Sequence, residues 1–262
     1  GELRVTYNLT TAFELPDLSD YNLCNAAEKL ELERLSGVYK APTESSQVVM
    51  DMKYNDLLLQ IQRGIDTDWL AQPLRNAFNH RHSVYMEGGV ESVRYGLDFN
   101  YDSNNGVMKG SYRSRMGVGL TLDYRYKKLQ IRNYVSYNST RAEDSPYGTF
   151  SEYAKMQPYY RIHDDDGNII ECYDEFGSDV NPIYKTTLES YSGKYRYNEL
   201  IDNLNVNWYI LDGLQFKGQF SITKTDATNE SFVDPKDYAY RRSEIKEKGR
   251  LDQNFENGYN WN

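Results

Sequence analysis

The stretch Val93-Arg94-Tyr95-Gly96-Leu97-Asp98-Phe99-Asn100-Tyr101 decides the fold class of this chain. Apolar and aromatic residues occupy its odd positions, and polar residues or glycine occupy its even positions. Because successive side chains of a β-strand point to opposite faces, the pattern predicts a strand with one apolar and one polar face. A strand of a soluble sandwich has the same pattern, so the connections between strands must distinguish the two architectures.

The composition narrows the class of protein. The chain has 262 residues, 39% of them hydrophobic, and a mean hydropathy of -0.79. No stretch approaches the roughly 20 apolar residues of a membrane-spanning helix, which excludes a helical membrane protein but leaves a barrel of alternating strands open. A net charge of -9 argues against a nucleic-acid partner. The 25 tyrosines suit strand surfaces, membrane interfaces and loops that contact carbohydrate.

Alternating segments recur along the whole chain. They predict seven strands and a last, partial strand near residues 259–262; the seven cover approximately residues 4–13, 79–86, 92–101, 114–126, 129–137, 200–210 and 214–222. Both ends of the chain resemble cuts within a longer protein, and no signal peptide is visible.

The lengths of the connections favour a membrane barrel. Long loops at about 15–77, 139–197 and 227–250 are separated by tight turns at 88–89, 127–128 and 212–213. In an up-and-down barrel this order places all long loops at one end, as in outer-membrane barrels with short periplasmic turns. We therefore predict an all-β fold, an antiparallel up-and-down transmembrane β-barrel segment of about 7–8 strands from a larger barrel, with long, partly helical extracellular loops.

Local signals predict structure inside the long loops. Helical spacing and a closing glycine predict one helix at 25–35, before Gly37, and a second at about 46–62, before Gly64. A turn at 164–168 predicts a small hairpin over 159–173.

Several of these segments, in this order, resemble the SusC/RagA family of TonB-linked outer-membrane transporters. The matching segments are Gly1-Glu2-Leu3-Arg4-Val5-Thr6-Tyr7-Asn8, Asn25-Ala26-Ala27-Glu28-Lys29-Leu30-Glu31, Asp66-Thr67-Asp68-Trp69, residues 79–89, Pro158-Tyr159-Tyr160 through Gly167, Asn181-Pro182-Ile183-Tyr184 and Leu211-Asp212-Gly213-Leu214. The first is similar to the family's first barrel strand, and the second to its first-loop helix. The resemblance covers nearly the whole chain and weakens after about Pro235.

The resemblance implies a longer protein with a signal peptide, an N-terminal plug and a barrel of about 22 strands. Residues 1–262 would be the N-terminal part of that barrel, with the plug domain absent. The implied function is import of a nutrient, an oligosaccharide first and a peptide second, across the outer membrane of a Gram-negative bacterium. The implied partners are a SusD-like surface lipoprotein, the TonB complex (through the absent N-terminal part) and outer-membrane lipid. A passive porin or adhesin-like barrel and a soluble β-rich carbohydrate-binding protein are the alternatives.

The sequence shows no recognisable catalytic or cofactor motif, so we expect a protein that is not an enzyme and has no cofactor. Residues 164–167 resemble part of a calcium loop, but counting back from Gly167 places Ile162 at the first ligand position, which favours a solvated turn. His80 and His82 share a strand face, and we interpret them as interface histidines rather than metal ligands. Charged residues on the predicted inner face suit a wet barrel interior or charge ladders against a plug; they are Arg94, Asp98, Arg115, Asp123, Arg125 and Arg132.

Two further predictions concern the long loops. Tyr147, Tyr153, Tyr159 and Tyr160, with Phe150 among them, suit either stacking surfaces for a ligand or a local hydrophobic core. Cys24 and Cys172 fall in loops at the same end of the predicted barrel. They are either two free thiols or, because an exported protein passes through an oxidising compartment, a disulfide between the loops.

Overall fold

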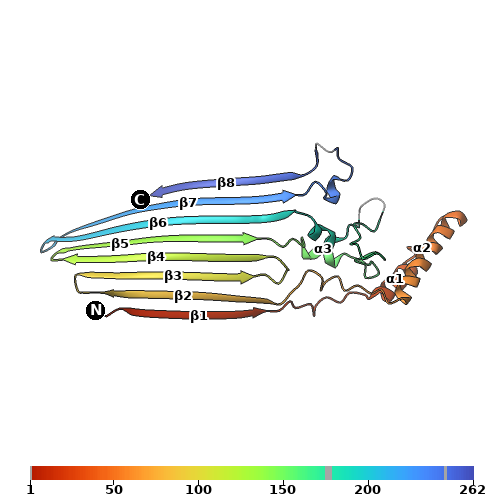
Figure 1. Cartoon of the computed structure of the whole chain (residues 1–262), viewed down its shortest axis with the longest axis horizontal. Coiled ribbons are helices and arrows are strands. Elements are labelled where there is room, and N and C mark those ends of the chain that lie inside the picture. The colour runs from red at the N-terminus through yellow and green to blue at the C-terminus, as the bar shows by residue number, and fades with distance from the viewer. Residues whose placement is uncertain (1, 175–178, 245–246) are drawn as a thin grey trace.

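The computed structural model describes residues 2–174, 179–244 and 247–262, which form one antiparallel sheet with helices at one end (Figure 1). The strands follow one another in sequence order across the sheet. Their bounds are β1 Arg4–Glu14, β2 Ala77–Gly89, β3 Val93–Asn105, β4 Tyr112–Tyr126, β5 Leu129–Glu143, β6 Tyr191–Leu211, β7 Leu214–Val233 and β8 Arg250–Trp261. The predicted all-β, up-and-down antiparallel fold is confirmed.

The strand register gathers the apolar residues on one face of the sheet, here called the outer face. Leu97 pairs with Leu120, which in turn pairs with Val135. One residue along, Asp98 pairs with Gly119, which pairs with Ser136, on the opposite, inner face. Because side chains alternate along each strand, this register keeps the two faces separate over the sheet.

Large apolar side chains on the outer face are exposed, whereas small residues in the middle of the inner face are buried. Leu120 keeps 49% of its surface exposed, whereas Ser136 keeps 5%. This is the reverse of a soluble protein, in which apolar faces pack inward. Asn133 and Asp202 interrupt the outer face and hydrogen-bond to each other, with Asn133 Nδ2 donating to Asp202 Oδ1 over 2.6 Å.

Short turns lie at one end of the sheet and long connections at the other, as predicted (Figure 1). Two-residue turns join β4 to β5 and β6 to β7. Lys127 in the first has a φ of 50°, and Gly213 in the second has a φ of 83°. Tight hairpin turns require such positive φ values because their backbone twist must match that of the strands.

Several strands extend further toward the long loops than the alternating pattern predicts. β5 continues to Glu143 and β7 to Val233, so the connections after them span 144–190 and 234–249. Polar pairs such as Arg141 and Arg196 continue the ladder there. Backbone hydrogen bonds maintain these ends without an apolar side-chain pattern, which explains why the pattern stops earlier.

The helices lie beyond the long-loop end of the strands (Figure 1). They are α1 Ala26–Ser36, α2 Glu44–Gln62, α3 Phe150–Ala154 and the short 3-10 helices Pro182–Thr187 and Tyr238–Tyr240. Asn25 begins α1 with a reciprocal capping box to Glu28, and Gly37 ends it in the left-handed conformation. Both predicted loop helices are confirmed. No helix among the described residues is long and apolar enough to cross a membrane.

Candidate functional site

The hydrophobic core of the described chain lies between the loops rather than on the sheet. Its most buried apolar residues include Leu30, Tyr39, Trp69, Tyr153 and Tyr159, a set called here the loop core. Three of them come from the connection between β1 and β2, and two come from the connection between β5 and β6. The loop core therefore joins two long connections that are far apart in sequence.

Backbone and side-chain hydrogen bonds fix these two connections against each other. Thr67 donates its backbone N–H to the carbonyl of Pro158 over 2.8 Å and its hydroxyl to the carbonyl of Tyr160 over 2.7 Å. Trp69 Nε1 donates to the carbonyl of Gln157 over 2.9 Å. Thr67 and Trp69 thus hold residues 157–160, so that the two segments are fixed together.

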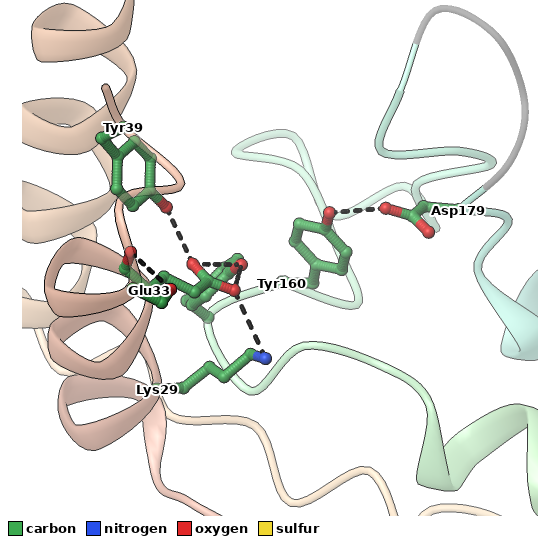
Figure 2. Close-up of polar contacts among 7 residues, drawn as sticks. Lys29, Glu33, Tyr39, Tyr160 and Asp179 are labelled. Atoms are coloured by element: carbon green, nitrogen blue, oxygen red, sulfur yellow. Dashed lines mark hydrogen bonds and ion pairs between the residues drawn. The ribbon is translucent and has the colours of Figure 1, made fainter. Parts of the chain in front are cut away.

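Glu33 is the polar centre of the loop core (Figure 2). Its carboxylate accepts hydrogen bonds from the hydroxyl of Tyr39, at 2.9 Å, and from the hydroxyl of Tyr159, at 2.9 and 3.0 Å. Lys29 Nζ lies 3.4 Å from Glu33 Oε1 and supplies the opposite charge. Burial, and then the hydrogen bond to Glu33, raises the pKa of Tyr39 and of Tyr159 well above the usual tyrosine range.

Sequence reasoning missed Glu33, although a signal was present. Ala26, Leu30 and Glu33 stand at helical spacings of four and three residues, so they share one face of α1. The first two are buried in the loop core, and a glutamate on such a face predicts a buried partner. The partners themselves could not be found in this way, because Tyr159 is 126 residues away.

The structure separates the four predicted tyrosines into two groups. Tyr153 and Tyr159 are buried in the loop core, the packing role that the sequence left open for them. Tyr160 is partly exposed, stacks on Tyr173 with ring centroids 4.1 Å apart, and donates its hydroxyl to Asp179 over 2.8 Å (Figure 2). Tyr147 lies apart, under the ammonium group of Lys109 at 5.5 Å from the ring centroid.

The hypothesised disulfide is not formed in the structure, where both cysteines are free thiols. Cys24 is exposed just before α1. Cys172 Sγ instead lies 3.2 Å from the carbonyl oxygen of Asp174 and 3.3 Å from that of Asp179. The local fold of its own loop therefore holds Cys172, and burial raises the pKa of its thiol.

The predicted hairpin over 159–173 is present only as a short reversal: His163 and Ile169 form an isolated bridge, Ile170 donates its backbone N–H to the carbonyl of Ile162 over 3.0 Å, and the flanking residues form no strands. Asp164 Oδ1 accepts the backbone N–H groups of Asp166 and Asn168 at 3.0 and 2.8 Å. These bonds lower the pKa of the Asp164 carboxyl. Among the described residues there is no group of three histidine, cysteine, aspartate or glutamate side chains that could hold a metal ion.

Charged residues predicted for the inner face are brought together by the register. Asp123 stands between Arg94 on one neighbouring strand and Arg132 on the other. Arg125 Nε lies 3.4 Å from its carboxylate. Further toward the loops, Asp102 pairs with Arg115 in the register and has Arg81 Nε at 3.8 Å. The inner face thus carries two cross-strand rows of alternating charges, with uncharged residues such as Gly119 and Ser136 between them.

A pocket opens beside the loop core, between the start of α1, residues 66–70 and residues 153–158. Its volume is about 550 Å³, within the usual range of ligand pockets. Polar, charged, aliphatic and aromatic side chains contribute to its wall. We call it the α1–α3 pocket.

Fold and surface together define a class of protein: an up-and-down antiparallel sheet with an exposed apolar outer face, a charged inner face and structured loops at one end. No protein-family model and no curated protein matches the sequence. Solved structures, however, match the fold. This chain is similar to a chain of the solved "Structure of the RagAB peptide transporter", with a TM-score of 0.72 and 17% sequence identity over 99% of the length of this chain.

Two further solved structures show the same likeness. The RagAB peptide importer in the "open-open" state gives a TM-score of 0.71 at 15% identity over all of this chain, and the "closed-closed" state gives 0.66 at 19% identity over 89%. The chain spans about a third of those proteins: 32%, 31% and 29% of their length. At such identities the likeness supports the fold, which resembles part of the RagAB chains.

Proposed function

We propose that this chain is a wall segment of a TonB-dependent importer in the outer membrane of a Gram-negative bacterium. The observation that carries the proposal is the reversed sheet, with an exposed apolar outer face and a polar, charged inner face. A lipid bilayer is the environment in which such an outer face is favourable, and a water-filled or plugged lumen suits the inner face. The likeness to transporter chains supports the same function.

A short peptide is the substrate class we now favour over an oligosaccharide. Oligosaccharide recognition needs exposed aromatic faces, but Tyr153 and Tyr159, two of the four candidate stacking residues, are buried in the loop core. Tyr147 and Tyr160 keep partly exposed rings and stay candidates for ligand contact. The similar solved structures are named as peptide transporters, which supports the peptide class.

We further propose that the long loops face the outside of the cell and meet a SusD-like surface lipoprotein. The sequence resemblance to the SusC/RagA family supports this partner and coupling to the TonB complex through an N-terminal plug. The alternating charges on the inner face, Asp123 with its neighbouring arginines among them, give a plug a complementary surface.

Uptake by cells tests this function. Cells that produce the intact protein containing this chain would be given fluorescent pentapeptides or a labelled oligosaccharide, with and without a protonophore. We expect accumulation of peptide that stops when the proton-motive force is removed. Accumulation that continues without the proton-motive force would instead identify a passive porin, and accumulation of the oligosaccharide alone would reverse the substrate class.

A soluble carbohydrate-binding protein is tested separately by its partitioning. If the protein stays in the aqueous phase without detergent, the outer face does not contact lipid and the importer proposal is wrong.

A further inference from the structure

The α1–α3 pocket contains an unused hydrogen-bonding group. Tyr153 is fully buried and lines the pocket, and its hydroxyl makes no hydrogen bond with any described residue. Buried polar groups in folded proteins almost always have a partner. The hydroxyls of Tyr39 and Tyr159, in the same loop core, both have one in Glu33. The exception at Tyr153 is therefore a property of this position and indicates a group that comes from elsewhere.

The pocket also presents charges of both signs. Asp66 and Asp68 each use Oδ1 to accept a backbone N–H, from Ala26 at 2.9 Å and from Ala71 at 3.2 Å. Those bonds fix the two carboxylates in place and leave Oδ2 of each available for a further donor. Lys155, which is exposed, lines the side formed by the other connection. A ligand with both an amino group and a carboxylate matches these residues.

The remaining wall contains aliphatic and aromatic side chains that differ in exposure. Leu23 and Leu32 line the pocket with more than half of their surfaces exposed. Trp69 is 3% exposed, so its ring is not available for stacking. Tyr21 has an exposed ring, and Phe150 contacts it edge-on at 5.5 Å. Among the described aromatic residues of this wall, Tyr21 alone presents an exposed ring, whereas the two exposed leucines beside fixed charges suit the side chains and ends of a peptide.

We propose that the α1–α3 pocket binds a short peptide, and that binding displaces the side chains that cover Tyr153 so that its hydroxyl donates to a peptide carbonyl. Asp66 and Asp68 take the amino group, Lys155 takes the carboxylate, and Leu23 and Leu32 contact an apolar side chain. The inference rests on the proposed import function for its ligand class. It adds a particular site on the loops at which the peptide is held before import.

Cys24 provides a reporter, because it lines the pocket and its thiol is exposed. The experiment uses the intact protein in detergent with the substitution Cys172→Ser. Of the two thiols of this chain, N-ethylmaleimide can then modify Cys24 alone. The rate of Cys24 modification is measured against increasing pentapeptide Leu-Lys-Leu-Lys-Leu and, separately, maltopentaose. Tyr153→Phe removes the unpaired hydroxyl alone. Tyr159→Phe is the matched control, since it removes a hydroxyl that Glu33 already occupies.

We expect the peptide to slow modification of Cys24. Tyr153→Phe should raise the peptide concentration that halves the rate of Cys24 modification by about threefold to tenfold, because one hydrogen bond to the peptide is lost. Tyr159→Phe should change it by less than about twofold, because its hydroxyl serves the loop core rather than the pocket. Without peptide, Cys24 should react equally fast in the protein with Tyr153 and in Tyr153→Phe.

Three results would overturn the proposal: equal protection with and without the Tyr153 hydroxyl, protection by maltopentaose alone, or no protection by either probe. Uptake of the same pentapeptide, measured in parallel, separates this proposal from the proposed function. Energised uptake without protection of Cys24 would contradict the pocket proposal and leave the importer proposal standing. Protection that is lost in Tyr153→Phe, in a protein that imports nothing, would support the pocket proposal and contradict the importer proposal.

Discussion

Replacing Glu33 by alanine should release the two long connections from each other. The change leaves the hydroxyls of Tyr39 and Tyr159 buried without their acceptor and removes the partner of Lys29. Each hydrogen bond to a charged group contributes about 1.5–3 kcal/mol. Relief of the carboxylate's own desolvation offsets part of the sum, since Glu33 keeps 13% of its side chain exposed. We expect a net loss of about 2–4 kcal/mol in the local stability of the loop core.

Hydrogen exchange of the intact protein in detergent measures this loss directly. Amides of α1 and of residues 157–160 should exchange about 30-fold to 1,000-fold faster in Glu33→Ala, and strand amides at the short-turn end should not change. Glu31→Ala is the matched control, because Glu31 pairs with Arg34 on the exposed side of the same helix. Its effect should be under about 0.5 kcal/mol. Unchanged protection in Glu33→Ala, or an equal effect of the two substitutions, would refute the reasoning.

Three other predictions follow from the same contacts and faces. Trp69→Phe should lower the local stability of the loop core by about 1–3 kcal/mol, since it loses a hydrogen bond to the facing connection; limited proteolysis of the loops should show it. The folded state raises the pKa of Tyr39 and Tyr159, so their contribution to the stability of the loop core is complete below the unfolded pKa of about 10 and falls as the pH rises above it. The absorbance of tyrosinate and the rate of loop proteolysis should therefore increase together above pH 10. Ionisation of these two tyrosines below pH 10 would contradict their burial. Leu120→Arg on the outer face should destabilise the bilayer-inserted protein by about 2–4 kcal/mol in urea unfolding, whereas Thr121→Arg on the inner face should cost much less; equal effects would argue against a lipid-facing surface.

The sheet could be predicted from the sequence because a side-chain period of two is visible in a single strand. The stretch that begins at Val93 shows both faces. The neighbouring strand β4, in which Leu120 lies opposite Leu97, repeats the same alternation in register. The ends of the strands could not be predicted in the same way. Beyond the apolar residues, pairs such as Arg141 and Arg196 carry no alternation, and backbone hydrogen bonds alone continue the ladder.

The loop helices were also predictable, since their limits depend on local chemistry. Asn25 and Gly37 mark the beginning and the end of α1 by capping, which needs no distant residue. The loop core was not predictable, because its contacts join segments about 90 residues apart or more. An aromatic residue in a loop can pack or bind, and only the surroundings of Tyr153 and Tyr160 distinguish the two roles.

Helix α2 has a mechanical consequence. It has 19 residues, none of them buried, and it extends away from the sheet beyond α1 (Figure 1). Its attachments are the short segment after Gly37, with the ring contact of Tyr39 with Tyr54 and the side chain of Gln47, and at its other end residues 63–66, where Asp66 accepts the backbone N–H of Ala26. At about 1.5 Å per residue the helix is roughly 28 Å long. A rotation of about 10° about one end of a rod of this length moves the other end by about 5 Å, so a small change where residues 37–43 or 63–66 meet the loop core would displace the far end of α2 much further.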